Sequence, residues 1–216
     1  MFDKEKIKAY STIFGGFCFM NLPGSLFITG VISPYIKSYY ALPKSGTMSQ
    51  NILPMGQIAG MCAMPFGSYL IEKNYNPKLM LISVEVLAIS CFLASAFMEN
   101  FYAFTFFYVI GFGSFNFIYM IPIHHGWLWF PNSAGLVSGI IISGYGFGSF
   151  IFDTVSTHVI NPDNLKIDET TGYYPEAVDD RFRHMMIVLT CSWAVIALIV
   201  VITVFPGPVK VHSSEL

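Results

Sequence analysis

Two acidic residues lie within long apolar stretches of this sequence. Glu85 stands in the stretch 78–98 and Asp153 in the stretch 133–158. If these stretches cross a membrane, placing each carboxyl within the lipid costs free energy. Each is therefore a candidate functional site. The alternative is structural: the side chain faces the interior of a helix bundle, carries a proton, or lies close to the membrane interface.

Two adjacent histidines, His124 and His125, precede Trp127 and Trp129. Neighbouring residues point to different faces of a helix, so a shared metal ion is not expected. They are interpreted as interfacial polar residues beside an aromatic belt, with a proton relay through His124 as the alternative. The sequence contains no nucleophile–base pair, metal cluster or cofactor fingerprint on a shared helix face. It therefore predicts no enzyme, no metal site and no cofactor.

The glycine pattern Gly144-Tyr-Gly146-Phe-Gly148 is not that of a nucleotide-binding loop. It lacks the Lys-Ser/Thr of a P-loop and lies inside an apolar stretch. Small residues at helical spacing allow membrane helices to approach closely, so we expect a packing role. The glycines assigned to helix packing are Gly56, Gly60, Gly135, Gly139, Gly144, Gly146 and Gly148.

The elements that carry these residues are predicted to be transmembrane helices. Hydrophobic residues make up 54% of the 216 residues and charged residues only 11%, far fewer than the surface of a soluble domain needs. About 20 apolar residues cross the hydrocarbon core of a bilayer. The predicted fold class is an all-α, multi-pass membrane protein with lipid as a partner, and its spans are 10–36, 48–71, 78–98, 101–125, 133–158 and 184–205.

The basic residues fit this division, because ten of the 11 Lys and Arg fall in a terminus or a connection and the other, Lys78, is the first residue of a span. The predicted organisation is an N-terminal segment 1–9, a bundle 10–205 with a polar loop at 159–183, and a tail 206–216. We expect both termini on the inner side. The net charge of −2 excludes a strongly basic surface, so nucleic acid is not an expected partner. The four cysteines are interpreted as buried thiols.

Several motifs together resemble one family. Trp129-Phe130-Pro131 is followed by Gly135-Leu136, and the glycine pattern at 144–148 comes after it. Earlier in the chain, Gly24 precedes Gly30-Val31 and Pro34. This arrangement is similar to the major facilitator superfamily, in particular its branch of oxalate/formate antiporters and monocarboxylate transporters. Family members have twelve helices in two halves, and this chain resembles the N-terminal six-helix half.

The resemblance implies a central cavity, for which the matching positions are Asn21, Phe27, Gln57, Asn116, Tyr119 and His124. In the family, the cations that bind substrate carboxylates lie mainly in the other half. Alternating access also needs two bundles about a site near the bilayer midplane.

Two functions follow as expectations. The first is a non-catalytic subunit packed among other subunits of a larger complex, with the mitochondrial inner membrane and its respiratory chain as a natural host. The alternative is a transporter of small mono- or dicarboxylates, acting as a dimer or with a separate second half.

Overall fold

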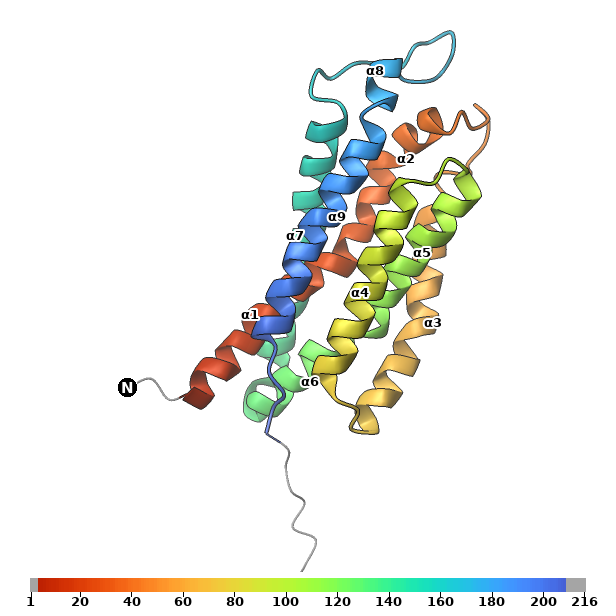
Figure 1. The fold of residues 1–216 in the computed structure, drawn as a ribbon. Coiled ribbons are helices and arrows are strands. Elements are labelled where there is room, and N and C mark those ends of the chain that lie inside the picture. Colours follow the sequence, from red (N-terminus) through yellow and green to blue (C-terminus); the bar gives the residue numbers. More distant parts are fainter. Residues whose placement is uncertain (1–3, 209–216) are drawn as a thin grey trace, which may run out of the picture.

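The computed structural model describes residues 4–208, and within them all regular structure is helical, as predicted. The elements are α1 (Lys4–Gly24), η1 (Ser25–Phe27), α2 (Ile28–Tyr39), α3 (Ile52–Glu72), α4 (Pro77–Ala96), α5 (Phe101–Phe117), α6 (Met120–Trp129), η2 (Pro131–Ser133), α7 (Ala134–Ile160), α8 (Glu176–Asp179) and α9 (Phe182–Thr203). Six long helical spans run between the two ends of one bundle (Figure 1), and two of them are interrupted.

Five of these spans are long and apolar enough to cross a membrane, namely 4–39, 77–96, 101–129, 131–160 and 176–203. The remaining span, α3, is the second along the chain. It has 21 residues, but Gln57, two prolines and three glycines lower its hydropathy. The first span begins at Lys4 rather than at residue 10. The reason is local: Lys and Glu favour helix, and Lys8 pairs with Glu5 at 3.0 Å. The five apolar spans make the chain a multi-pass membrane protein.

Two asparagines start consecutive helices at the positions where the sequence predicted breaks. The side chain of Asn76 accepts hydrogen bonds from the amides of Lys78 (3.0 Å) and Leu79 (3.3 Å) at the start of α4. Asn100 does the same for Tyr102 (2.8 Å) and Ala103 (3.3 Å) at the start of α5. Each cap satisfies amides that have no partner within their own helix.

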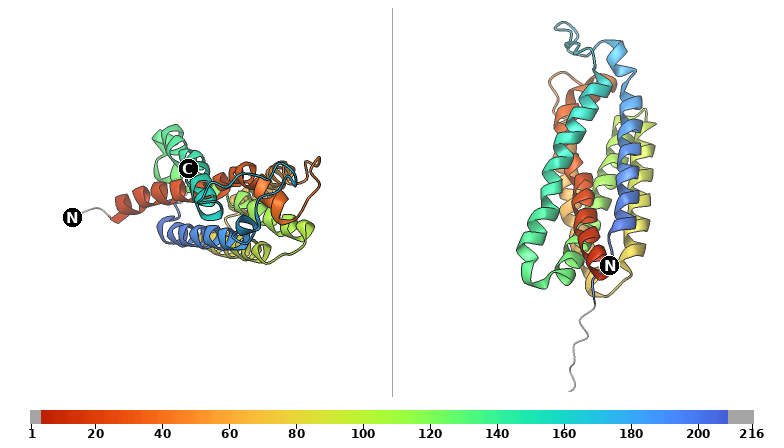
Figure 2. Two further views of the ribbon diagram at one scale, coloured as in Figure 1. Left: turned by 90° about the horizontal axis from the view of Figure 1, so that it is seen from above. Right: turned by 90° about the vertical axis from the view of Figure 1, so that its left-hand side faces the viewer.

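The packing of the six spans is nearly symmetric between the first three and the last three. The most extensive helix contacts are α1 with α7, α3 with α5, α4 with α5, α1 with α9, and α4 with α9. Exchanging spans one to three with spans four to six turns α1–α7 into α3–α5 and α4–α5 into α1–α9, and it leaves α4–α9 unchanged. Figure 2 shows α1 between α7 and α9 in its right-hand view. An inverted repeat of three helices produces this pattern.

The core between α4, α5 and α9 is aromatic. Trp193 is fully buried, and its ring centroid lies 4.6 Å from that of Phe92 and 5.8 Å from that of Phe112. Tyr108 and Phe115 complete the cluster against Phe92. The buried-thiol interpretation needs correction for two cysteines, because Cys62 and Cys191 are exposed on the outside of the bundle.

Each end of the bundle is tied by hydrogen bonds between distant segments. At one end, the Ser38 hydroxyl donates to Asp179 (3.0 Å) and accepts from the amide of Tyr174 (2.8 Å). At the other end, the amide of Phe205 donates to the Thr12 hydroxyl (3.0 Å), and the Trp129 indole donates to the Phe205 carbonyl (3.2 Å). These ties join the first span to the segments on either side of α9, so the bundle is held as one body at both ends.

Candidate functional site

Two of the spans are broken, and they occupy corresponding places in the two halves of the fold. The first span changes to a 3-10 turn at Ser25–Phe27, directly after Pro23 and Gly24. The fourth span is interrupted between Phe117 and Met120. Paired breaks of this kind free backbone groups near the middle of a membrane bundle, and in transporters they mark the binding site.

Four side chains gather at the breaks, and we call them the break cluster: Phe27, Gln57, Tyr119 and Tyr145. The rings of Phe27 and Tyr145 meet edge to face, with centroids 5.8 Å apart. The Tyr145 hydroxyl interacts with the side-chain amide of Gln57. It also lies close enough to the Tyr119 hydroxyl for an electrostatic interaction between the two. Phe27 is exposed and the other three are half-buried. The cluster therefore offers an aromatic surface with two hydroxyls and one amide.

Two asparagines assigned to the cavity are used in packing. The Asn21 amide donates to the Phe17 carbonyl at 2.8 Å, and the Asn116 amide donates to the Phe112 carbonyl at 3.0 Å. The backbone of Asn21 packs against Gly148, and the Asn116 side chain packs against Gly60. The structure therefore places both beside the close helix contacts.

His124 lies apart from the break cluster, on α6. Its ring centroid is 5.3 Å from that of His125, and its Nδ1 atom is buried without a hydrogen-bond partner among the described residues. His125 is buried, and its Nδ1 accepts from the amide of Gly207 at 3.2 Å. The pair therefore belongs to the end of the bundle where the chain leaves α9.

Asp153 lies on α7, on a line of polar residues that begins in the break cluster. Tyr145, Ser149, Asp153 and Thr157 recur every four residues, which places them on one face of the helix. Asp153 lines a pocket of about 510 Å³ with Thr157, with Val31 of α2 and with residues at and just after the end of α7. One of its carboxyl oxygens is buried without a partner among the described residues. The line connects the break cluster with the end of the bundle that carries the loop 161–175.

Glu85 occupies a different part of the molecule. It lies between α4 and α9, in a groove to which the break cluster contributes no residue. Both acids lie on helices of the bundle, but only Asp153 shares a helix face with a residue of the break cluster, Tyr145.

Four of the seven glycines assigned to packing lie at close helix contacts. A Cβ added to Gly144 would lie 2.1 Å from the Phe17 carbonyl oxygen, and one added to Gly148 would lie 2.3 Å from the Asn21 carbonyl oxygen. Gly56 and Gly60 would meet side chains at 2.8 and 2.7 Å. Gly135, Gly139 and Gly146 lie at no helix contact among the described residues, so a packing role for them stays a prediction. No described atom lies within 4 Å of an added Cβ at any of the three, because they lie on the outer face of α7.

The Trp-Phe-Pro motif forms the turn between α6 and α7. The Trp129 indole binds the Phe205 carbonyl, the Phe130 ring lies 5.4 Å from that of Tyr10, and Pro131 starts η2. Gly135 and Leu136 follow on the exposed start of α7, where Leu136 is 69% exposed. The motif thus joins the first half of α1 and the segment after α9 to the turn between α6 and α7.

No positive charge reaches the break cluster from the part of the chain that the structure describes. Lys and Arg within residues 4–208 all lie in connections or in the first or last two turns of a helix span. The same residues contain no group of His, Cys, Asp and Glu that could hold a metal ion. The site can therefore stack against and hydrogen-bond a small polar molecule, but it supplies no cation to neutralise an anion.

These features define a multi-pass integral membrane protein whose first and fourth spans are broken. No family model matches the chain. One relative is apicoplast pyruvate carrier 1 of Toxoplasma gondii, which is 29% identical over 109 residues, or 49% of this chain. The match spans only 20% of that protein's length. The chain is thus distantly and partially similar to a pyruvate carrier, which points away from an enzyme.

Sequence reasoning missed Tyr145 as a site residue. It stood between two glycines and was absorbed into the packing interpretation, although it links Phe27 and Gln57 in the structure. The spacing of Tyr145, Ser149 and Asp153 on one helix face was the signal that could have found it.

Proposed function

We propose that this chain is one bundle of a transporter for small monocarboxylates, built like half of a major facilitator-type carrier. The observation that carries the proposal is the break cluster, which gathers at the two corresponding helix breaks. The similarity to a pyruvate carrier supports the substrate class.

The break cluster supplies part of what a monocarboxylate needs. The hydroxyls of Tyr119 and Tyr145 and the amide of Gln57 can donate hydrogen bonds to carboxylate or keto oxygens, and Phe27 covers the apolar end. The missing part is a cation, because an anion that leaves water must be compensated. A second bundle supplies this cation and the opposite wall of the site. It is either a second copy of the chain or a separate half.

The exposed face of α7 fits such a second bundle. Gly135, Gly139 and Gly146 leave room at helical spacing for another helix to approach, and this face lies next to the polar line that begins at Tyr145. In this role the three glycines are packing residues between bundles.

The test is uptake of radiolabelled pyruvate by proteoliposomes of the purified chain, and by vesicles of native membranes with and without the chain. Tyr145→Phe removes one hydroxyl and should reduce kcat/KM by about 2- to 13-fold, the worth of one hydrogen bond. Tyr102→Phe is the matched control, because Tyr102 is 69% exposed on α5 and away from the cluster.

Uptake by the purified chain supports a homodimer, and uptake only in native membranes supports a separate second half. If removing the chain changes uptake in neither system, the transporter function is rejected. A non-catalytic subunit of a larger complex is the competing proposal. The comparison with a carrier favours the transporter, and no feature of the described residues favours the subunit.

A further inference from the structure

A groove of about 460 Å³ runs between α4 and α9 on the outside of the bundle. Aliphatic side chains and small residues line it, namely Ile82, Val86, Ile89, Ala197, Leu198 and Val201. Its size lies within the range of small-molecule sites. The rim is exposed, with Val86 and Leu198 61% and 62% accessible, so the groove opens toward lipid.

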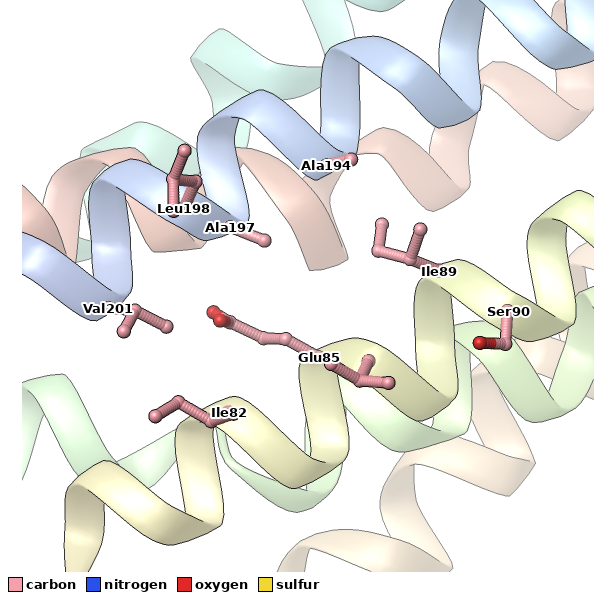
Figure 3. Close-up of a pocket in the computed structure, with 9 residues that line it drawn as sticks. Ile82, Glu85, Ile89, Ser90, Ala194, Ala197, Leu198 and Val201 are labelled. Carbon is pink, nitrogen blue, oxygen red and sulfur yellow. The ribbon is translucent and has the colours of Figure 1, made fainter.

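The groove contains a carboxyl group that no described residue pairs with. Glu85 is only 3% exposed, and neither of its carboxyl oxygens has a hydrogen-bond partner within residues 4–208. Its side chain extends from α4 into the space between the two helices, toward Ala197 and Val201 (Figure 3). Buried polar groups in proteins nearly always have partners, so this unpartnered carboxyl makes the groove a candidate binding site.

The nearest cation along the helix is already used. Lys78 lies two turns before Glu85, but its ammonium group donates to the Val201 carbonyl and lies 4.7 Å from the centre of the Phe205 ring. Glu85 takes part in no ion pair among the described residues. An isolated charge at this place would be costly, so we expect the neutral acid, which has one donor and further acceptor capacity.

The depth of the carboxyl limits what can reach it. Glu85 is eight residues from the start of α4 at Pro77, or about 12 Å along the axis, and the 20-residue helix matches the hydrocarbon thickness. The charged headgroup of a phospholipid stays outside this layer. A transmembrane helix is about 10 Å wide and would rest on the exposed rim above the carboxyl.

We propose that the groove binds a neutral lipid that has one hydroxyl or carbonyl group on a slender aliphatic body. The carboxyl of Glu85 exchanges a hydrogen bond with that group, and the aliphatic walls cover the chain. This site lies apart from the break cluster and does not depend on the proposed transport.

The test uses the full chain in lipid nanodiscs and a long-chain alcohol that carries a diazirine and a terminal alkyne. After photolysis, mass spectrometry locates the label. The corresponding alkane probe without the hydroxyl measures non-specific contact with lipid-facing helices. We expect labelling of the α4 and α9 peptides by the alcohol, at least about tenfold competed by the unlabelled alcohol, and uniform labelling of outer helices by the alkane.

Two variants keep the result interpretable. Glu85→Leu removes an unsatisfied buried polar group and should leave the fold intact, while labelling of the groove falls by about 2- to 13-fold, the worth of one hydrogen bond. Glu85→Gln keeps a donor and an acceptor and should retain most of it. Ala194 also lines the groove and is only half-buried, so Ala194→Trp fills the groove while keeping Glu85 and should also abolish labelling.

Equal labelling by both probes, or labelling that none of these variants changes, would overturn the proposal. A chemical crosslink between two copies of the chain through α4 or α9, formed without any lipid probe, would also overturn it. The occupant of the groove would then be a second copy.

Discussion

Replacing Gly144 by alanine tests the closest approach between α1 and α7, and Gly146 on the same helix supplies the control. A Cβ at Gly144 would lie 2.1 Å from the Phe17 carbonyl oxygen, whereas an ordinary contact is 3.4–4 Å. The carbonyl or the whole of α7 must therefore move by more than 1 Å. At Gly146 the added methyl group meets no described atom within 4 Å.

The expected difference follows from these distances. Both variants gain the same helix propensity, up to about 1 kcal/mol, so this contribution cancels between them. Overpacking costs about 1–3 kcal/mol, and here it acts on backbone, which cannot rotate away. Gly144→Ala should therefore be less stable than Gly146→Ala by about 1–3 kcal/mol, or about 5- to 150-fold in the unfolding equilibrium constant.

Reversible unfolding in mixed micelles of mild detergent and sodium dodecyl sulfate measures this difference. The fluorescence of Trp193 reports it, because that side chain is fully buried in the core. Unfolding of the two variants at the same mole fraction of dodecyl sulfate would refute the close contact between α1 and α7.

Three further predictions concern the loop end and the core. Ser38→Ala removes hydrogen bonds to Asp179 and Tyr174 and should speed hydrogen exchange of the segment 161–175, by about 2- to 13-fold per bond lost; unchanged exchange would show that the tie is unimportant. Hydrogen bonds from the Thr170 hydroxyl and amide lower the pKa of Asp168, so this local stabilisation is present above the ordinary value of about 3.9 and is lost as pH falls through the lowered pKa. The loop should loosen only in strong acid by hydrogen exchange, and Asp168→Asn should remove that pH dependence; loosening already near neutral pH would contradict it. Trp193→Ala should cost about 3–5 kcal/mol in the same micelle titration, followed by circular dichroism, and a cost below about 1 kcal/mol would mean that the aromatic core is not packed as described.

The sequence predicted the helical spans well because hydropathy and end signals act locally. Asn76 and Asn100 cap helices at two of the gaps between the predicted spans, 72–77 and 99–100. It was less informative about α3, whose Gln57, prolines and glycines weaken its hydropathy while placing a polar group in the break cluster.

The side chains were predicted less well, because a periodic pattern does not show which neighbour it faces. Gly144 and Gly146 are two residues apart and look equivalent in the sequence. One contacts α1 and the other faces outward, since a helix turns by about 200° over that distance. Glu85 and Asp153 likewise look alike, yet one lies between α4 and α9 and the other on the line that begins at Tyr145.

The sequence by itself determined that this protein lies in a bilayer. Only 11% of its residues are charged, too few for the surface of a soluble domain, and its basic residues lie in termini, in connections or at the ends of spans. Only the tertiary structure decided where the chemistry lies. The two helix breaks lie at corresponding places because the first three spans and the last three are packed in a nearly symmetric way. This packing brings Phe27, Gln57 and Tyr145 together from three separate spans. Contacts between residues so far apart in the chain depend on the shape of the whole bundle, which no local pattern encodes.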